Sequence, residues 1–221
     1  MDTCNCNVPS WLSQEAIDRI VPKVGESLFI AWAGTVIGAI FSFPISFLAA
    51  NNVSLNSFSR ATKQVLNVIR AFPELILAFV LLPITGLGPL TGTLAVGIHS
   101  IGTLGKLSSE VIEGIDEGPL ESIKSSGGSK LNELFFGVIP QVMPTITSYW
   151  LYRFEINLRA SAVLGVVGAG GVGAELINQL RFRDFPRAGT VLVVTIVMVL
   201  IVDAISAAIR RRIIKGRDIK V

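Results

Sequence analysis

The 221-residue sequence has few charged residues, cysteines and histidines, and each shortage excludes a class of protein. Charged residues make up 16%, whereas soluble domains carry roughly 25%. Cys4 and Cys6 are the only cysteines, and without partner histidines they form neither a disulfide framework nor a good metal site. The chain has no G-x-x-x-x-G-K-[ST] motif and no paired nucleophile and base. We therefore expect any ATP hydrolysis to come from a partner chain, and a membrane enzyme is the less favoured alternative.

The sequence is instead dominated by long apolar segments. Hydrophobic residues reach 51% and the mean hydropathy is +0.63. Several blocks approach the ~20 residues that a helix needs to cross hydrocarbon. The sequence predicts an all-α integral membrane protein with about five transmembrane helices. The expected spans are residues 28–50, 71–82, 90–104, from 134 to beyond Tyr152, and 188–209.

The positive charges predict how the chain is oriented. The segments expected inside carry 12 Lys and Arg, and those expected outside carry 5, so the C-terminus should be cytoplasmic and the N-terminus extracytoplasmic. The basic run that starts at Arg210 follows an apolar span, which favours a membrane anchor over a nucleic-acid site. Residues 1–27 form an expected extracytoplasmic segment with an amphipathic helix and no cleavable signal peptide, and 28–221 form the transmembrane domain.

A polar loop between the third and fourth spans carries the most informative spacing. Residues 121–140 read ESIKSSGGSKLNELFFGVIP, which by itself is an amphipathic connector that Gly127 and Gly128 would break into two short helices. Glu121, Gly127 six residues later and Pro140 thirteen further resemble the EAA loop of ABC-type import permeases. That resemblance implies ATPase coupling through Glu121, Ser122, Ile123, Gly127 and Pro140, within a loop of about 117–140. Ser122 and Ile123 replace the family's two alanines, and Gly137 replaces an apolar residue.

A glycine run further on has two readings. Gly168, Gly170, Gly171 and Gly173 belong to GAGGVG, formally a G-x-G-x-x-G motif. A dinucleotide site would need a strand before it, and none is expected. We interpret the run as a helix end with irregular backbone that lines a cavity and serves as a gate.

Three charged residues lie where hydrocarbon depth is expected. Arg153, Glu155 and Arg159 belong to the stretch LYRFEINLRASAVL. Charges at that depth are usually paired or functional. Glu155 and Arg159 have the spacing of a helical ion pair, which leaves Arg153 without an obvious local partner. Alternatively, all three line the route of an anion, because a guanidinium suits a phosphorus oxyanion. His99, the single histidine, is expected to be a packed neutral side chain rather than a proton relay.

Four segments extend the resemblance to most of the chain. The sequence is similar to the phosphonate-uptake permease family of ABC importers, a type I architecture shared with MetI-like permeases. The matching segments are Arg70–Leu75 (RAFPEL), Gly86–Glu110 (GLGPLTGTLAVGIHSIGTLGKLSSE), Glu117–Pro144 (EGPLESIKSSGGSKLNELFFGVIPQVMP) and Ser148–Gly173 (SYWLYRFEINLRASAVLGVVGAGGVG). Many family members carry another apolar span before the first one found here.

This resemblance implies function and partners. It implies an importer of a phosphonate or related phosphorus oxyanion in the inner (plasma) membrane, working by alternating access. A second permease, identical or paralogous, two ATP-binding subunits and an extracytoplasmic substrate-binding protein would complete it. ATP and Mg²⁺ would bind the partner ATPase, with no cofactor on this chain. Phosphate, phosphite or methionine remain alternative cargoes, and a passive anion channel is a further alternative. Arg181, Arg183 and Arg187 would meet the binding protein or lipid headgroups.

Overall fold

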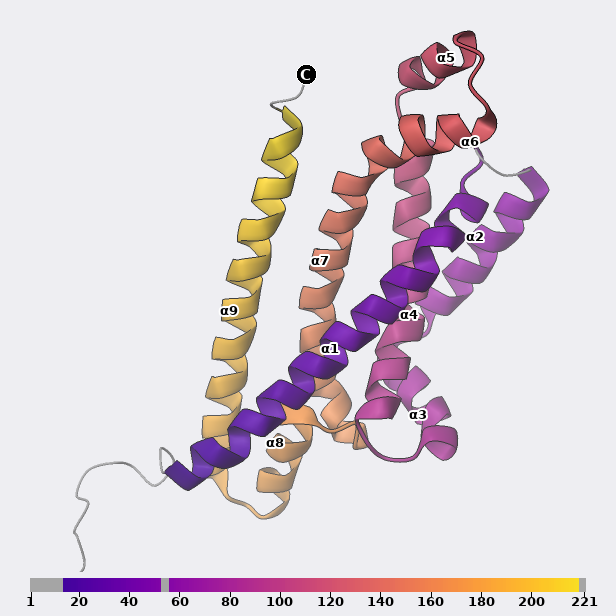
Figure 1. Ribbon diagram of the computed structural model, residues 1–221. Coiled ribbons are helices and arrows are strands. Elements are labelled where there is room, and N and C mark those ends of the chain that lie inside the picture. The colour runs from indigo at the N-terminus through magenta and orange to yellow at the C-terminus, as the bar shows by residue number, and fades with distance from the viewer. Residues whose placement is uncertain (1–13, 53–55, 219–221) are drawn as a thin grey trace, which may run out of the picture. The chain divides into compact units, whose positions relative to one another are not determined.

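The computed structural model describes residues 14–52 and 56–218, and each regular element within those residues is a helix (Figure 1). This confirms the all-α membrane fold expected from the sequence. A helix satisfies its own backbone hydrogen bonds, as hydrocarbon requires. The elements are α1 (Gln14–Ala49), α2 (Asn56–Ala71), α3 (Glu74–Thr85), α4 (Pro89–Glu113), α5 (Gly118–Ser125), α6 (Lys130–Asn132), the π-helix η2 (Glu133–Val138), α7 (Ile139–Leu164), the 3₁₀-helix η3 (Gly165–Val167), α8 (Gly171–Arg181) and α9 (Phe185–Asp218).

Some sequence expectations fall outside the described residues. Cys4 and Cys6 lie there, as do Trp11 and Leu12 of the expected amphipathic helix. Within the described part, α1 runs from Gln14 to Ala49, so no break marks the segment boundary expected at residue 27. The side chains of the basic C-terminal tail are described only as far as Arg212.

The helices differ in their suitability for crossing a membrane. Asp18–Ala49 and Phe185–Ile213 are long and apolar enough by themselves, and the number rises to four if each of two bent helix pairs is one span. One bent pair joins α2 to α3 at 87°, where Pro73 lacks an N–H and restricts the residue before it. The other joins Lys130–Val167 to α8 at 40°. The helix α4, the expected third span, is rich in Gly, Ser and Thr and does not meet this apolarity criterion.

The chain divides into two compact units, which we describe separately. Unit 1 comprises Met1–Gly34, Glu74–Val96 and Glu155–Ala204, and unit 2 comprises Thr35–Pro73, Gly97–Phe154 and Ile205–Val221. Unit 1 has a core of small and branched apolar residues, namely Ala78, Ala95, Val96, Leu164, Val167 and Ala169. Glycine brings its helices together: a Cβ on Gly34 would lie 2.9 Å from Val96, and one on Gly92 would lie 3.0 Å from Ala169.

Unit 2 is also built on close helix contacts. Its core comprises Ala50, Ile112, Val138, Val142 and Ile146, flanked by edge-to-face contacts of Phe43 with Phe47 and Trp150. The helix α2 runs beside α4 (Figure 1), where Cβ atoms on Gly102 and Gly105 would each lie 2.9 Å from atoms of α2. On α1, a Cβ on Gly38 would lie 2.4 Å from the Cβ of Ser100. Small residues of this kind are typical of helix contacts in membranes.

A carboxylate at the end of α4 links three segments of unit 2. The Asn51 backbone N–H donates to Glu113 Oε1 at 2.7 Å, and Lys63 forms an ion pair with the same oxygen. Burial alone would raise the pKa of the Glu113 carboxyl, but the hydrogen bonds from Lys63 and Asn51 outweigh it. The pKa of Glu113 is therefore held below its ordinary value, so the ionised form is the one that stabilises the fold.

We expect Glu113→Gln to lower the apparent unfolding temperature of the detergent-solubilised protein at neutral pH. Because the folded-state pKa is lowered, the stabilisation is present above the unfolded-state pKa and is lost as the pH falls through the folded-state value. The difference in unfolding temperature between wild type and variant should disappear below about pH 4. Glu110→Gln, which removes a more exposed carboxylate paired with Lys106, should have the smaller effect. A gap that stays constant with pH would contradict this account.

Candidate coupling loop and charged helix

The loop expected to couple to an ATPase starts with a defined turn. Asp116 Oδ1 accepts a hydrogen bond from the Gly118 N–H at 3.1 Å, and Pro119 occupies the start of α5, where its missing N–H costs nothing. Gln141 of α7 holds this turn from the other side of the loop. Its Nε2 donates to the carbonyls of Asp116 and Gly137, and its Oε1 accepts from the Asp116 N–H. The first residues of α5 are thus tied to the first turn of α7.

Two glycines end α5, which confirms the predicted break. The Gly128 N–H donates to the Ile123 carbonyl at 2.9 Å, and the Gly127 N–H donates to the Lys124 carbonyl at 3.0 Å. This is the Schellman arrangement, and it requires the left-handed backbone of Gly127, whose φ is +76°. A Cβ on Gly128 would lie 2.5 Å from Ile123 Cγ2. Neither position therefore accepts a side chain without a shift of the loop.

The second half of the loop packs on α5 through Gly137. Ser129 caps the short helix α6, which passes into the π-helix η2 before α7. A Cβ on Gly137 would lie 3.1 Å from Leu120 Cδ1 and 3.3 Å from Ile123 Cδ1. Gly137 and Ile123, two of the departures from the family pattern, therefore lie against each other. A larger residue on α5 fills the space that the glycine leaves on η2.

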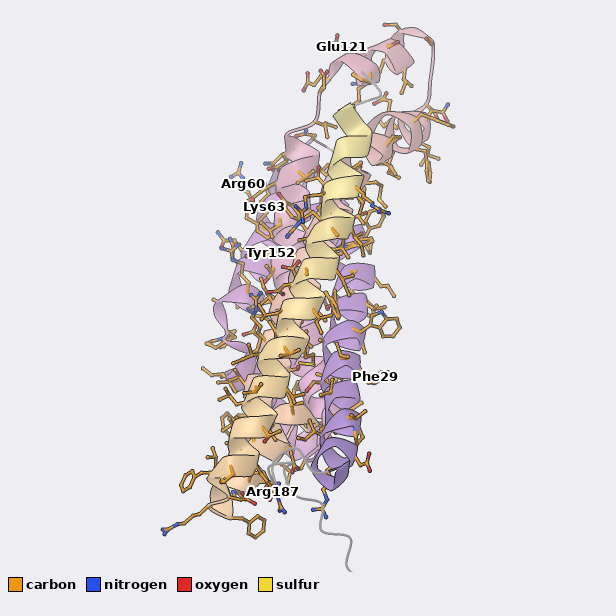
Figure 2. All side chains as sticks on the ribbon, turned by 90° about the vertical axis from the view of Figure 1, so that its left-hand side faces the viewer. Phe29, Arg60, Lys63, Glu121, Tyr152 and Arg187 are labelled. Atoms are coloured by element: carbon orange, nitrogen blue, oxygen red, sulfur yellow. The ribbon has the colours of Figure 1, made fainter. Side chains whose placement is uncertain are left out.

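The predicted coupling residues divide between two faces of the loop. Glu121, Ser122 and Gly127 are exposed, and Figure 2 shows Glu121 directed away from the ribbon at α5. Ile123 is half-buried against Gly137, and Pro140 is exposed at the start of α7. The structure thus presents an acidic and polar surface on α5, while Ile123 fixes that helix to η2.

Arg153 on α7 is buried in unit 2 with 4% of its surface exposed. Its Nε donates to Ser100 Oγ at 3.0 Å, and its Nη2 contacts His99 Nδ1. Both partners belong to α4, more than fifty residues away, so the local sequence does not reveal them. Since a guanidinium only donates hydrogen bonds, His99 Nδ1 is the acceptor side of this contact. His99 is half-buried against Arg153, so it is a packed side chain as expected from the sequence.

The two other charged residues of this helix belong to unit 1. Glu155 is buried at 6% exposure. Arg159 forms an ion pair through Nη2 with Asp203 Oδ2 on α9, so the pairing expected with Glu155 is wrong for Arg159. Sequence reasoning missed Asp203. A signal was present, because Asp203 is an acidic residue inside the apolar span expected at 188–209, and such residues are rarely without a purpose.

The glycine run forms irregular backbone in unit 1. Gly168, Gly170 and Gly171 have φ values of +77°, +84° and +69°, in a region that favours glycine. A Cβ on Gly173 would lie 1.8 Å from the Ala162 carbonyl oxygen, so α8 folds directly against the end of α7. The Val172 N–H donates to Ser27 Oγ at 3.0 Å, which joins the turn to α1. The turn follows a helix, and the described residues contain no strand that a dinucleotide site would require.

A cleft of about 600 Å³ lies beside this turn. Gly168 lines it together with Lys23, Leu87 and Arg181, whereas Gly170, Gly171 and Gly173 are not part of its lining. Of the two other arginines predicted to meet a binding protein or lipid headgroups, Arg187 forms an ion pair with Asp184 at 3.3 Å. Arg183 has a positive φ of 57° just after α8. Arg181 lines the cleft beside the glycine turn, whereas Arg187 lines another cleft that contains neither Arg181 nor Arg183, so the two clefts do not bring the three arginines together.

Residues 42–215 match the protein family described as "Binding-protein-dependent transport system inner membrane component". The chain belongs to this family. It is a multi-pass inner-membrane permease subunit rather than an enzyme. Its partners are a separate ATPase chain and a substrate-binding protein.

The chain is also similar to individual permease proteins of known transport systems. The chain is 39% identical over 187 residues to the phosphite transport system permease protein PtxC of Stutzerimonas stutzeri, covering 84% of this chain and 68% of PtxC. It is 42% identical over 209 residues to the phosphate-import permease protein PhnE of Mycolicibacterium smegmatis, covering 89% of this chain but 39% of that protein. A putative cryptic phosphonate transport system permease protein, PhnE2 of Escherichia coli K12, is 46% identical over 55% of this chain and 99% of its own length.

Solved structures confirm the MetI-like architecture. The chain matches the structure "Inward facing conformations of the MetNI methionine ABC transporter" with a TM-score of 0.79 at 18% identity, covering 91% of this chain and 99% of the other. It matches the "Crystal structure of an amino acid ABC transporter with histidines" with a TM-score of 0.76 at 20% identity, covering 93% and 100%. At these identities the likeness concerns the fold alone.

The contact between α5 and η2 leads to a prediction about side-chain size. Gly137→Leu should displace α5, because the new side chain would occupy the space of Leu120 and Ile123. Overpacking of this kind typically costs about 1–3 kcal/mol. Adding Ile123→Ala should recover most of the loss, and a double-mutant cycle on the detergent-solubilised protein would measure the coupling. Additive effects of the two substitutions would contradict the predicted contact.

Proposed function

We propose that this chain is the permease subunit through which a phosphorus oxyanion, such as a phosphonate, phosphite or phosphate, crosses the inner membrane. The 39% identity to a phosphite permease over 84% of the chain carries this assignment. The relatives named for phosphate and phosphonate support the same ligand class. These ligands share a tetrahedral phosphorus centre with anionic oxygens, for which a guanidinium is a well-matched donor.

The proposed machine uses alternating access driven by a partner. Two permeases, identical or paralogous, would assemble with two ATP-binding subunits and an extracytoplasmic binding protein. ATP and Mg²⁺ would bind the ATPase, and this chain would bind no cofactor of its own. The exposed face of α5 at Glu121 and Ser122 would dock into a groove of the ATPase, as an exposed helix suits. Ile123, Gly127 and Pro140 would hold that helix in place.

The path of the anion would follow α7. Arg153, Glu155 and Arg159 would line it, and Gly168, Gly170, Gly171 and Gly173 would form the gate beside the cleft near Arg181. The excess of Lys and Arg in the segments expected inside supports a cytoplasmic C-terminus and an extracytoplasmic N-terminus. Residues 1–27 would then be an extracytoplasmic segment before the transmembrane domain of 28–221. Arg181, Arg183 and Arg187 would face the binding protein or lipid headgroups.

Reconstitution with the ATPase and the binding protein tests this function. Proteoliposomes should take up phosphite, phosphate or methylphosphonate only when ATP and the loaded binding protein are present, and methionine should not be transported. Uptake without ATP would indicate a passive channel, and uptake of methionine alone would refute the ligand class. A permease that purifies without retaining the ATPase would contradict the coupling role of the loop.

We expect Glu121→Ala to weaken coupling to the ATPase. Loss of a contact worth about 1.4 kcal/mol would reduce association about tenfold and lower the stimulated ATP hydrolysis accordingly. Glu117→Ala is the matched control, because Glu117 is also an exposed acid on the same loop but lies before the first turn of α5. Equal effects of the two substitutions would show that loop charge, rather than the position of Glu121, matters.

We expect Arg153→Ala to abolish most uptake while the complex still assembles. The substitution removes a buried guanidinium that donates to Ser100 and contacts His99, and a guanidinium is the group suited to bind the anion. Arg153→Lys should restore little, because an ammonium cannot reproduce the fork that spans both partners. Arg60→Ala, at an exposed cation of α2, should leave uptake unchanged. Unchanged uptake by Arg153→Ala would remove Arg153 from the path.

A further inference from the structure

An ion pair between α7 and α9 has no assigned role. Arg159 Nη2 meets Asp203 Oδ2, and the two residues are 44 positions apart in the sequence. Asp203 lies within Phe185–Ile213, one of the two helices able to cross a membrane unaided, and its neighbours there are Val202 and Ala204. A carboxylate in such a segment is costly and usually serves a function.

The ion pair engages one nitrogen of the Arg159 guanidinium and one oxygen of the Asp203 carboxylate. Asp203 Oδ1 is buried and has no hydrogen-bond partner among the described residues. The structure gives Arg159 no second ion pair within the described chain, and its side chain is 52% exposed. An arginine and a carboxylate pair most strongly through two parallel hydrogen bonds, and this pair has one. Several guanidinium N–H groups therefore remain available to another acceptor.

We propose that Arg159 is an anion-binding subsite and that Asp203 is its displaceable counter-ion. This inference rests on the proposed function and adds a residue to it. In the empty path the Asp203 carboxylate neutralises Arg159. When a phosphorus oxyanion arrives, it takes the place of that carboxylate on the guanidinium.

The chemistry of the two acceptors favours this exchange. A phosphorus oxyanion such as phosphate offers several acceptor oxygens and up to about two negative charges, so it can engage the guanidinium fork more fully than one carboxylate oxygen does. The carboxylate in turn keeps the subsite weak, because the anion must replace it. A transport path needs sites that release their ligand as readily as they bind it.

A second ion pair of unit 1 provides a matched control. Asp184 and Arg187 pair at 3.3 Å, with side-chain exposures of 30% and 51%, compared with 30% and 52% for Asp203 and Arg159. The two acids are thus equally exposed, and each pairs with one arginine, although Asp184 Oδ1 also accepts a hydrogen bond from the Arg187 N–H. They differ in position, since Asp184 precedes the first turn of α9 and Asp203 lies within its apolar part. Removing each charge separates the effect of the subsite from a general change of charge.

The experiment measures binding of labelled phosphite and phosphate to the purified permease–ATPase complex without the binding protein. Asp203→Asn should tighten binding at least threefold, since the competing carboxylate is gone. Arg159→Gln should weaken it to background, and Asp184→Asn should leave it unchanged. If Asp203→Asn lowers the unfolding temperature but leaves anion binding as in wild type, the pair is structural and the proposal is overturned.

An infrared measurement and an uptake measurement test the proposal independently of the Asp203→Asn variant. If Asp203→Asn does not assemble, wild-type complex labelled with ¹³C-aspartate should show a perturbed carboxylate band in its phosphite-induced infrared difference spectrum. That band should be absent from Arg159→Gln, and a silent wild-type spectrum overturns the proposal. Uptake by the wild-type proteoliposomes distinguishes failure of the proposed subsite from failure of the proposed function. Uptake of a phosphorus oxyanion without an effect at Asp203 refutes the subsite alone, and absence of any such uptake refutes the proposed function together with it.

Discussion

Close helix approach through glycine is the constraint on which unit 2 depends. Lipid tails are as apolar as leucine, so helices in a membrane gain little from hydrophobic burial against each other and rely on close contact. Gly38 meets Ser100, while Gly102 and Gly105 admit α2 to α4. This packing fixes α4, and α4 supplies both partners of Arg153. A side chain at these glycines would separate the helices that hold the buried guanidinium.

The charges on α7 follow a common rule. Each arginine of this helix is held by a helix remote in sequence, Arg153 by α4 and Arg159 by α9. Arg153 contacts the Ser100 hydroxyl and the His99 ring, whereas Arg159 forms an ion pair with Asp203. One helix thus carries two arginines that contact different kinds of partner on two other helices.

The sequence predicted local features better than distant ones. Apolar blocks indicated the membrane helices, and Gly127 with Gly128 indicated the end of α5, because both depend on neighbouring residues alone. The partners of Arg159 and Arg153 were not predicted, since helix periodicity does not reveal which residues meet across helices. The hydropathy pattern did not predict the 87° bend between α2 and α3, although Pro73 marks its position. The roles of the coupling and path residues remain predictions.

The contact of Ile123 with Gly137 has a consequence for chimeras between permeases. The Ile123 side chain occupies the space that a side chain at position 137 would need. The two halves of the loop must therefore be exchanged together. A graft that imports only the α5 half from a relative with a small residue at position 123 would leave a void against Gly137. A graft of only the η2 half, with a bulkier residue at 137, would displace α5 through Leu120 and Ile123. Interchangeable parts in this transporter family are therefore expected to begin before Gly118 and end after Val138.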